Sequence, residues 1–213
     1  MQFDFDSMTG LERFEFLTGT IVPRPIALIT TIDAHGRLNA APYSFFNIVG
    51  HDPAVVAVGV LPHSEGRLKD TGLNILDTQE FVVNLVSEEL AEAMNTTCID
   101  APPGFDELSL TDLKTAPSTH VRPARILSAP AAFECRVHSS ISLGPNQAIV
   151  IGRILTAHID DRFVADFEKR SIDTPAMKLI GGMHGAKWYT RTSDQFGMDR
   201  PTWAARQKKG TPA

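Results

Sequence analysis

Residues 26–47 read IALITTIDAHGRLNAAPYSFFN, and this stretch decides the fold. Its first seven residues form an apolar run with two threonines, which is typical of a β-strand. Residues 33–36 have turn chemistry, with Gly36 able to adopt a positive φ. Residues 38–47 are then expected to return as the second strand, in which Pro42 favours an edge, a bulge or a strand end. The stretch therefore predicts an antiparallel hairpin.

Outward from this hairpin, the chain continues as strands with helices inserted between them. Further strands are predicted over residues 54–60, 81–86, 131–142, 148–159 and 187–192. Helices are predicted over residues 9–19, 69–78, 87–95 and 163–169, with a short helical piece near 105–110. In the helix over 69–78, Leu73, Ile75 and Leu76 are expected to face inward. Residues 98–130 are a long excursion rich in proline, threonine and aspartate, which is typical of a lid, a dimer contact or an insertion.

Hairpin spacing, with helices inserted rather than alternating with strands, argues against a doubly wound parallel sheet. The pattern favours a mainly β fold, an antiparallel barrel that carries helices at its ends. We expect a single domain over residues 1–199, with its core at about 20–160 and C-terminal elements to about 192. Residues 200–213 are expected to form an extended or disordered tail.

Composition narrows the class of protein. The chain has 213 residues, 43% of them hydrophobic, and a net charge of −5, so nothing in it favours nucleic acid or an anionic membrane. No apolar stretch approaches the ~20 residues that cross a bilayer, and no signal peptide is evident. A cytoplasmic protein is the expectation. Cys98 and Cys135 form no metal-binding pair, and the histidines lack metal-site spacing.

Two polar segments beside apolar runs indicate a ligand. Lys69 and Arg67 supply cations, Thr71 and Ser44 supply hydroxyls, and the first turn of a helix supplies free N–H groups, which together suit a phosphate. The alternative is a capped surface helix with solvated charges. Phe45 and Phe46 should point to opposite faces of a strand, one toward the core and one toward a pocket. The residues that could hold an aromatic ring are Thr30, Thr31, Ser44, Phe45, Phe46 and Asn47, of which Asn47 either caps a turn or binds the ligand.

The sequence motifs of several enzyme classes are absent from this chain. The chain contains no nucleophile elbow, no P-loop and no Gly-x-Gly-x-x-Gly fingerprint, so hydrolase, P-loop and Rossmann interpretations have no support. No catalytic acid–base pair stands out either. His184 lies in a glycine-rich turn that could close over a ligand, or it is simply an exposed turn histidine.

Taken in order, these motifs resemble the flavin reductase-like family, in its flavoredoxin-type branch. The resemblance covers about residues 20–160, and its motifs are residues 24–31, 39–47, 69–75 and 81–85. It implies an FMN-binding split barrel and a homodimer with the flavin near the subunit interface. By position, Ser44, Phe45 and Asn47 would contact the flavin and Lys69 and Thr71 its phosphate, with Arg67 and Asn74 as further candidates.

The resemblance also implies an activity, because in such a protein the flavin carries the chemistry. The leading expectation is an NAD(P)H-dependent flavin reductase that uses NADH or NADPH and can pass electrons to a redox partner protein. A second possibility is a flavoredoxin-like electron carrier with tightly held FMN and no NAD(P)H turnover. A third is a non-enzymatic barrel that binds another ligand. The sequence does not separate the first two.

Overall fold

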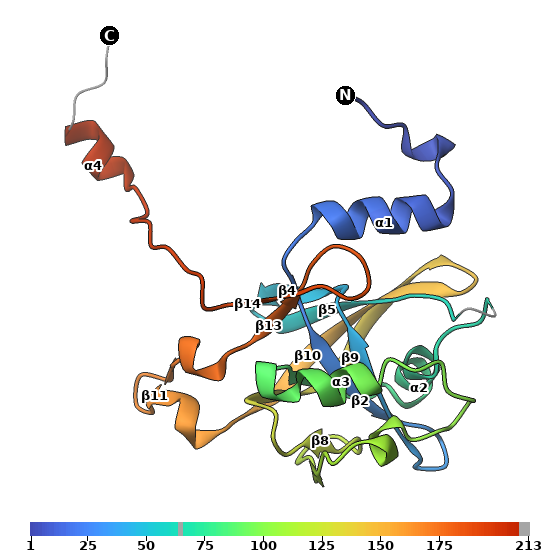
Figure 1. The fold of residues 1–213 in the computed structure, drawn as a ribbon. Coiled ribbons are helices and arrows are strands. Elements are labelled where there is room, and N and C mark those ends of the chain that lie inside the picture. The colour runs from blue at the N-terminus through green and yellow to red at the C-terminus, as the bar shows by residue number, and fades with distance from the viewer. Residues whose placement is uncertain (64–65, 209–213) are drawn as a thin grey trace.

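The computed structural model describes residues 1–63 and 66–208, and its centre is a seven-stranded antiparallel sheet (Figure 1). The strand order is β3-β2-β6-β9-β10-β5-β4. The strands are β2 Ala27–Ile32, β3 Leu38–Tyr43, β4 Phe46–His51, β5 Ala54–Val60, β6 Glu80–Leu85, β9 Ala131–Gly144 and β10 Gln147–Ile159. The edge strands β3 and β4 are consecutive in the chain but do not pair with each other. This confirms the predicted mainly β fold, an antiparallel barrel that is split at one seam.

The predicted hairpin is present as β2 and β3. Strand β2 is buried almost throughout, which explains its apolar sequence. In the turn, Gly36 has a φ of 81°, and the Asp33 carboxylate accepts hydrogen bonds from the N–H groups of His35 and Arg37 at 2.8 and 2.9 Å. Asp33 therefore fixes the turn that Gly36 permits.

The prediction of one returning strand over residues 38–47 is wrong, because the chain breaks at Ser44 and Phe45. Strand β3 ends at Tyr43 and β4 begins at Phe46, at the opposite edge of the sheet. Pro42 has no N–H to continue a ladder, and the Phe45 carbonyl instead accepts from the Gly59 N–H at 2.7 Å. The chain thus crosses the seam of the barrel at Ser44.

Helices cover parts of the barrel. The main ones are α1 Gly10–Thr20, α2 Asp70–Thr78 and α3 Ala91–Thr96, and α1 begins with a capping box. In Figure 1, α2 and α3 lie close to the sheet, whereas α1 stands apart on the side of the N-terminus. In α2, Ile75 is fully buried as predicted, but Leu73 is 47% exposed. Leu73 lies on the solvent side of a helix that has only one buried face, so its predicted inward orientation is wrong.

The core has two main parts on opposite faces of the sheet. One cluster fills the barrel interior and includes Ile29, Val58, Ile75 and Phe81. A Cβ at Gly152 would lie 2.3 Å from the Phe81 ring, so only glycine leaves space for that ring. The second cluster joins the outer face to the helices and the excursion, and it comprises Ile26, Leu28, Ala40, Val86, Leu90, Met94, Leu108, Ile126, Ala129 and Ile180.

The excursion over residues 98–130 packs against the sheet. It contains a 3₁₀ helix, Glu107–Leu110, and two short paired strands, β7 Thr115–Ala116 and β8 Arg125–Ile126. Glu134 on β9 is fully buried and accepts hydrogen bonds from the N–H groups of Thr119 and His120 at 2.7 and 2.5 Å. Glu134 therefore holds the far end of the excursion in place.

Two predictions near the C-terminus are wrong. Residues 163–169 are not helical: a 3₁₀ turn leads into β11 Val164–Asp166, which pairs with β12 Ser171–Ile172. The chain reverses there through Arg170, whose φ is 52°. Farther on, part of the expected extended tail forms the helix α4 Trp203–Lys208, which projects away from the body in Figure 1. Residues 209–213 of that prediction lie outside the described residues.

A small three-stranded sheet completes the fold, in the order β1-β13-β14. It joins β1 Arg24–Pro25 to β13 Ile180–Gly182, which pairs in turn with β14 Tyr189–Arg191. The sheet brings the glycine-rich turn after β13 close to the start of the barrel. Within the described residues, no helix is long and apolar enough to cross a membrane.

Candidate functional site

A hollow of about 120 Å³ lies where β3 faces the start of α2, and we call it the charged hollow. Its walls come from the end of β3, the segment that leads into α2, and the first part of the excursion. It is lined by Asn39, Ala41, Pro42, Tyr43, His63, Arg67, Lys69, Asp70, Thr71, Thr97, Cys98, Ile99, Asp100, Ala101 and Glu107.

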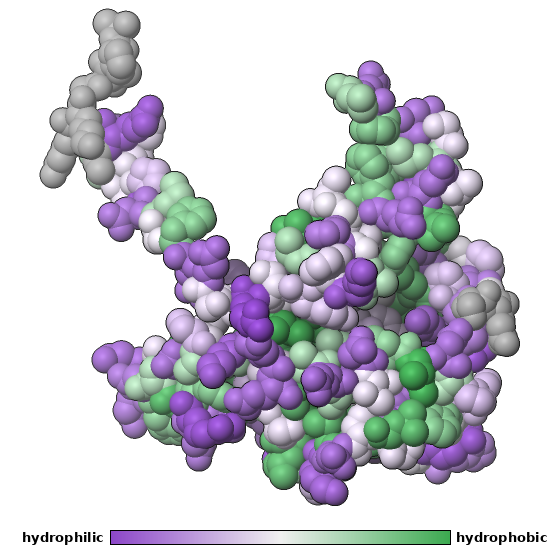
Figure 2. All heavy atoms as spheres, viewed as in Figure 1, coloured by the Kyte–Doolittle hydropathy of each residue, from purple (hydrophilic) through white to green (hydrophobic). Residues whose placement is uncertain are grey.

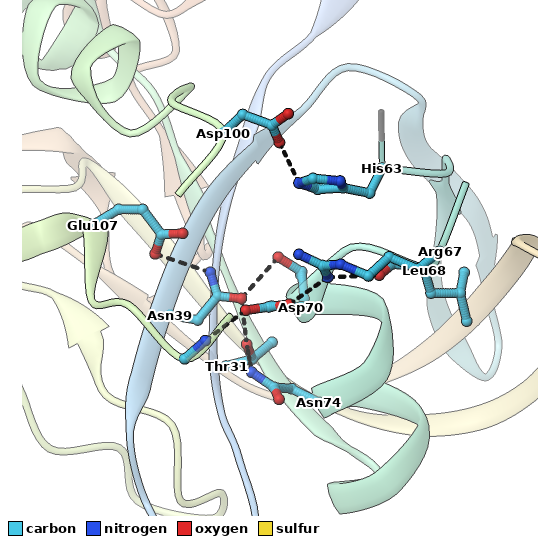
Figure 3. Close-up of polar contacts among 11 residues, drawn as sticks. Thr31, Asn39, His63, Arg67, Leu68, Asp70, Asn74, Asp100 and Glu107 are labelled. Carbon is cyan, nitrogen blue, oxygen red and sulfur yellow. Dashed lines mark hydrogen bonds and ion pairs between the residues drawn. The ribbon is translucent and has the colours of Figure 1, made fainter. Parts of the chain in front are cut away.

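A buried hydrogen-bond network forms the floor of the charged hollow (Figure 3). The Thr71 hydroxyl donates to Asn39 Oδ1 at 3.1 Å, and the Asn39 amide donates to Glu107 Oε2 at 3.1 Å. Behind them, the Asn74 amide donates to the Thr31 hydroxyl at 3.0 Å. Asn39 thus connects β3 to both α2 and the 3₁₀ helix of the excursion, and it fixes the position of Thr71.

The start of α2 leaves donors for a ligand. The Asp70 carboxylate is occupied by Arg67 Nη1 at 2.8 Å and by the Gly104 N–H at 2.8 Å. Lys69 is the N-cap residue of α2, and its side chain forms no capping hydrogen bond with the N–H groups of the first turn. The Lys69 side chain is exposed, and no ion pair to it is recorded within residues 1–63 and 66–208.

A second hollow of about 160 Å³ adjoins the first, and we call it the aromatic hollow. The two share Pro42, Tyr43 and Cys98. Ser44 lines it, and so does Trp188, whose ring stacks on His184 at 6.0 Å between ring centroids. Its lining is Phe14, Thr18, Arg24, Ile26, Pro42, Tyr43, Ser44, Met94, Cys98, Gly182, Gly185, Ala186, Trp188 and Tyr189.

Arg24 stands at one wall of the aromatic hollow and is 9% exposed. Its guanidinium donates to the carbonyls of Thr18 at 2.6 Å, Ile21 at 3.1 Å and Met183 at 2.7 Å, and to the Ser44 hydroxyl at 3.3 Å. Burial lowers the pKa of Arg24. A buried cation thus joins the end of α1, the seam of the barrel and the glycine-rich turn.

A third and larger hollow of about 470 Å³ is mainly apolar, and we call it the apolar hollow. It meets the aromatic hollow at Arg24 and Ser44. Phe45 and Phe46 both line it, although they were expected to face opposite ways, because the chain break at Ser44 removes the strand alternation. Its lining is Leu17, Ile21, Pro23, Arg24, Pro25, Ser44, Phe45, Phe46, Asn47, Ala57, Gly59, Val60, Leu61, Leu143, Gln147, Ala148 and Ile149.

The structure separates the predicted site residues into three groups. The first lines the two adjoining hollows and comprises Ser44, Arg67, Lys69 and Thr71. The second lines the apolar hollow and comprises Phe45, Phe46 and Asn47. The third is buried outside the hollows and comprises Thr30, Thr31 and Asn74.

These placements change what some residues can do. The Asn47 side chain accepts from the N–H of Ile48 at 2.8 Å, so it acts in part as a local cap. Thr30 donates to the Ala124 carbonyl at 2.6 Å deep in the sheet, and we assign it to the core rather than to a ligand. Asn74 donates to Thr31, which donates to Asn39 Oδ1 at 3.4 Å, so both residues are linked to Thr71 through Asn39.

Sequence reasoning missed Arg24, Asn39, Tyr43 and Glu107. Burial raises the pKa of Glu107, although the N–H of Ala40 and the Asn39 amide donate to its carboxylate. Burial also raises the pKa of Tyr43 to about 12. An arginine between two prolines and an asparagine on a buried strand face were the available signals. Neither identifies a partner that lies far away in the chain.

The two adjoining hollows offer cations, hydroxyls and helix N–H groups at one end and aromatic walls at the other. That donor set fits a phosphorylated aromatic molecule such as FMN. No group of side chains that could hold a metal ion occurs among the residues described. The arrangement can bind and orient such a molecule.

Comparison with known proteins shows which family and which solved structures this chain is similar to. The family model described as flavin reductase like domain matches residues 18–171. An uncharacterized protein of Deinococcus radiodurans is 39% identical over 97% of this chain and 92% of its own length. The crystal structure of Pseudomonas fluorescens 2-nitrobenzoate 2-nitroreductase NbaA is 32% identical, with a TM-score of 0.86 over 95% of this chain and 98% of that one. Nitrilotriacetate monooxygenase component B from Bacillus cereus is 31% identical, also with a TM-score of 0.86, over 93% and 98%.

Proposed function

Because the chain belongs to the flavin reductase-like family, we propose that it is an FMN-binding oxidoreductase that takes electrons from NADH or NADPH. The observation that carries the proposal is the junction of the charged and aromatic hollows at Pro42, Tyr43 and Cys98. The two adjoining hollows, together called the recess, thus have phosphate-type donors at one end and aromatic walls at the other.

Within this proposal, the chain binds and orients, and the bound flavin supplies the two-electron chemistry. Lys69, Arg67 and the first-turn N–H groups of α2 attract the phosphate, and Thr71 donates to it. Ser44 stands at the ring end of the recess. Phe45, Phe46 and Asn47 wall the apolar hollow on the other side of Ser44, where a second, apolar reactant can approach.

The similar structures indicate which acceptors to test. One is a 2-nitrobenzoate 2-nitroreductase and the other is a component of a monooxygenase. We therefore propose that the final acceptor is an aromatic nitro compound, free flavin or a partner oxygenase, and that the apolar hollow favours the first. Turnover of nitrobenzoates, compared with that of free FMN, distinguishes these acceptors.

We expect the purified protein to quench FMN fluorescence and, without oxygen, to lose the 450 nm band of FMN when NADH or NADPH is added. Loss of this absorption band, at about 450 nm, reports reduction of the flavin, because the flavin is the redox group. Flavin that stays oxidised with both nicotinamides but is reduced by dithionite would identify an electron carrier. Protein that leaves FMN fluorescence unchanged would overturn the flavin assignment and leave a barrel for another ligand.

We further propose that the protein is a homodimer, because edge strand β4 and the end of the β9–β10 hairpin expose apolar side chains. Ile48 and Val49 on edge strand β4 are 65% and 56% exposed, and Ile141 and Leu143 near the β9–β10 turn are also exposed. An unpaired edge with apolar side chains normally needs a partner. Figure 2 shows apolar residues also along the projecting N-terminal segment.

Sedimentation should then give twice the 23.3 kDa of one chain. The Ile48→Glu variant is expected to shift the protein toward monomer, since the new charge would be buried at the interface. Leu127→Glu is the matched control, because Leu127 is 55% exposed on the excursion, away from β4. A wild-type chain that sediments as a monomer at micromolar concentration contradicts the proposal.

A further inference from the structure

Tyr43 at the end of β3 combines a buried ring with an unpartnered hydroxyl. Its ring packs in the barrel core, and the residue is 6% exposed. Among the described residues, Tyr43 Oη makes no hydrogen bond of good geometry, although the Thr71 hydroxyl lies close enough to lower the pKa of Tyr43. A buried hydroxyl without a partner costs about 1–3 kcal/mol, so phenylalanine would serve the core better. The core alone therefore does not explain a tyrosine here.

The surroundings of the hydroxyl point to the charged hollow. Tyr43 is one of the residues common to the charged and aromatic hollows. Besides burial, the nearby charges of Glu107 and Asp70 raise the pKa of Tyr43, and the Thr71 hydroxyl moderates the shift. All three of these neighbours line the charged hollow. The phenol thus stays protonated at neutral pH and is available as a donor there.

Neither acid next to Tyr43 accepts this proton. Asp70 is engaged by Arg67 and the Gly104 N–H. Glu107 is engaged by Asn39 and the N–H of Ala40. The phenol is thus left as a buried donor in a residue that lines the charged hollow together with Lys69 and Thr71. An anionic oxygen placed in that space would satisfy it.

We propose that Tyr43 is a binding residue whose hydroxyl donates a hydrogen bond to the phosphate of bound FMN. The inference rests on the proposed function. It adds to the motif residues a phosphate ligand that comes from the core of the barrel rather than from its rim. It also explains why a tyrosine is buried at the junction of the two hollows.

The test is the Tyr43→Phe variant, titrated with FMN and with riboflavin by fluorescence quenching. The dissociation constant for FMN should rise about tenfold or more, the usual effect of a hydrogen bond to a charged group. The constant for riboflavin, which lacks the phosphate, should change less than about twofold. Lys69→Ala is the reference variant, because loss of a phosphate cation should give the same pattern.

Unfolding of the ligand-free variant by denaturant separates binding from structure. Removal of an unpartnered hydroxyl should leave the stability of the ligand-free protein unchanged or raise it. Three results would overturn the proposal. Tyr43→Phe could bind FMN as tightly as the wild type does, or its binding of riboflavin could weaken as much as its binding of FMN. The third is a loss of stability in the ligand-free variant. Wild-type protein that binds no FMN would instead refute the proposed function, so the two failures are distinguishable.

Discussion

Replacement of Arg24 by methionine is expected to destabilise the protein by about 3 kcal/mol and to weaken FMN binding at least tenfold. Methionine keeps the apolar stem but removes four donated hydrogen bonds, three of them to backbone carbonyls. Those carbonyls belong to α1 and to the glycine-rich turn. Their release should loosen the wall of the aromatic hollow and with it the ring end of the recess.

The Arg24→Lys variant controls for charge. Lysine keeps the cation but cannot reproduce the planar fork that reaches several acceptors at once. We expect the stability of Arg24→Lys to lie between those of the wild type and Arg24→Met, as measured by urea unfolding of the ligand-free proteins. If Arg24→Met unfolds like the wild type, Arg24 does not clamp these segments. If the stability of Arg24→Met falls while its FMN binding is unchanged, the hydrogen bonds of Arg24 stabilise the fold but do not shape the FMN site.

The second large effect is expected at Glu134, where glutamine should cost about 2–4 kcal/mol of stability. The Glu134 carboxylate is fully buried and accepts from the N–H groups of Thr119 and His120 and from His158 Nε2 at 2.6 Å. Glutamine has one acceptor oxygen instead of two and presents an amide N–H to a backbone donor. The excursion should therefore detach from β9 first, which hydrogen exchange at residues 119 and 120 would show.

The same carboxylate predicts a pH dependence. Burial alone would raise the pKa of Glu134, but the hydrogen bonds from Thr119, His158 and His120 outweigh it, and the pKa is lowered overall. Its stabilising contribution is therefore present above the unfolded pKa of about 4.3 and is lost as the pH falls through the lower folded value. Wild-type stability should decline in this acidic range, and the decline should be smaller in Glu134→Gln.

A surface carboxylate supplies the comparison for Glu134. Glu88 pairs with Arg191 at an exposed position, and Glu88→Gln should leave both the stability and its pH profile nearly unchanged. If Glu88→Gln and Glu134→Gln have equal effects, the excursion is not anchored as described. An unaltered exchange rate at residues 119 and 120 in Glu134→Gln would lead to the same conclusion.

Most strands of the large sheet were predictable from local sequence, because β2, β5, β6, β9 and β10 are apolar or alternating runs bounded by turn residues. The break at Ser44 was not, since residues 38–47 are apolar on both sides of it and no local signal shows that the two halves join opposite sheet edges. The helix expected over 163–169 failed for a related reason. Its composition suits a helix, but Arg170 reverses the chain and pairs β11 with β12.

Within the site, the cations and hydroxyls next to α2 were predictable because they are close in sequence. The contacts that organise them were not. Asn39 meets Glu107 from 68 residues away, and Arg24 reaches the carbonyl of Met183 from 159 residues away. Residues so far apart show no sequence spacing that would predict their contact. Arg24, Asn39 and Glu107 could therefore be recognised as site residues only from the fold.

The partition between the aromatic and apolar hollows is thin, because Arg24 and Ser44 are the two side chains that both hollows have in common. Two reactants on either side of this partition need not compete for one entrance. If FMN occupies the aromatic hollow as proposed, Arg24 and Ser44 alone would separate it from a reactant in the apolar hollow. A second reactant in the apolar hollow would then approach the flavin from the side of Phe45 and Phe46.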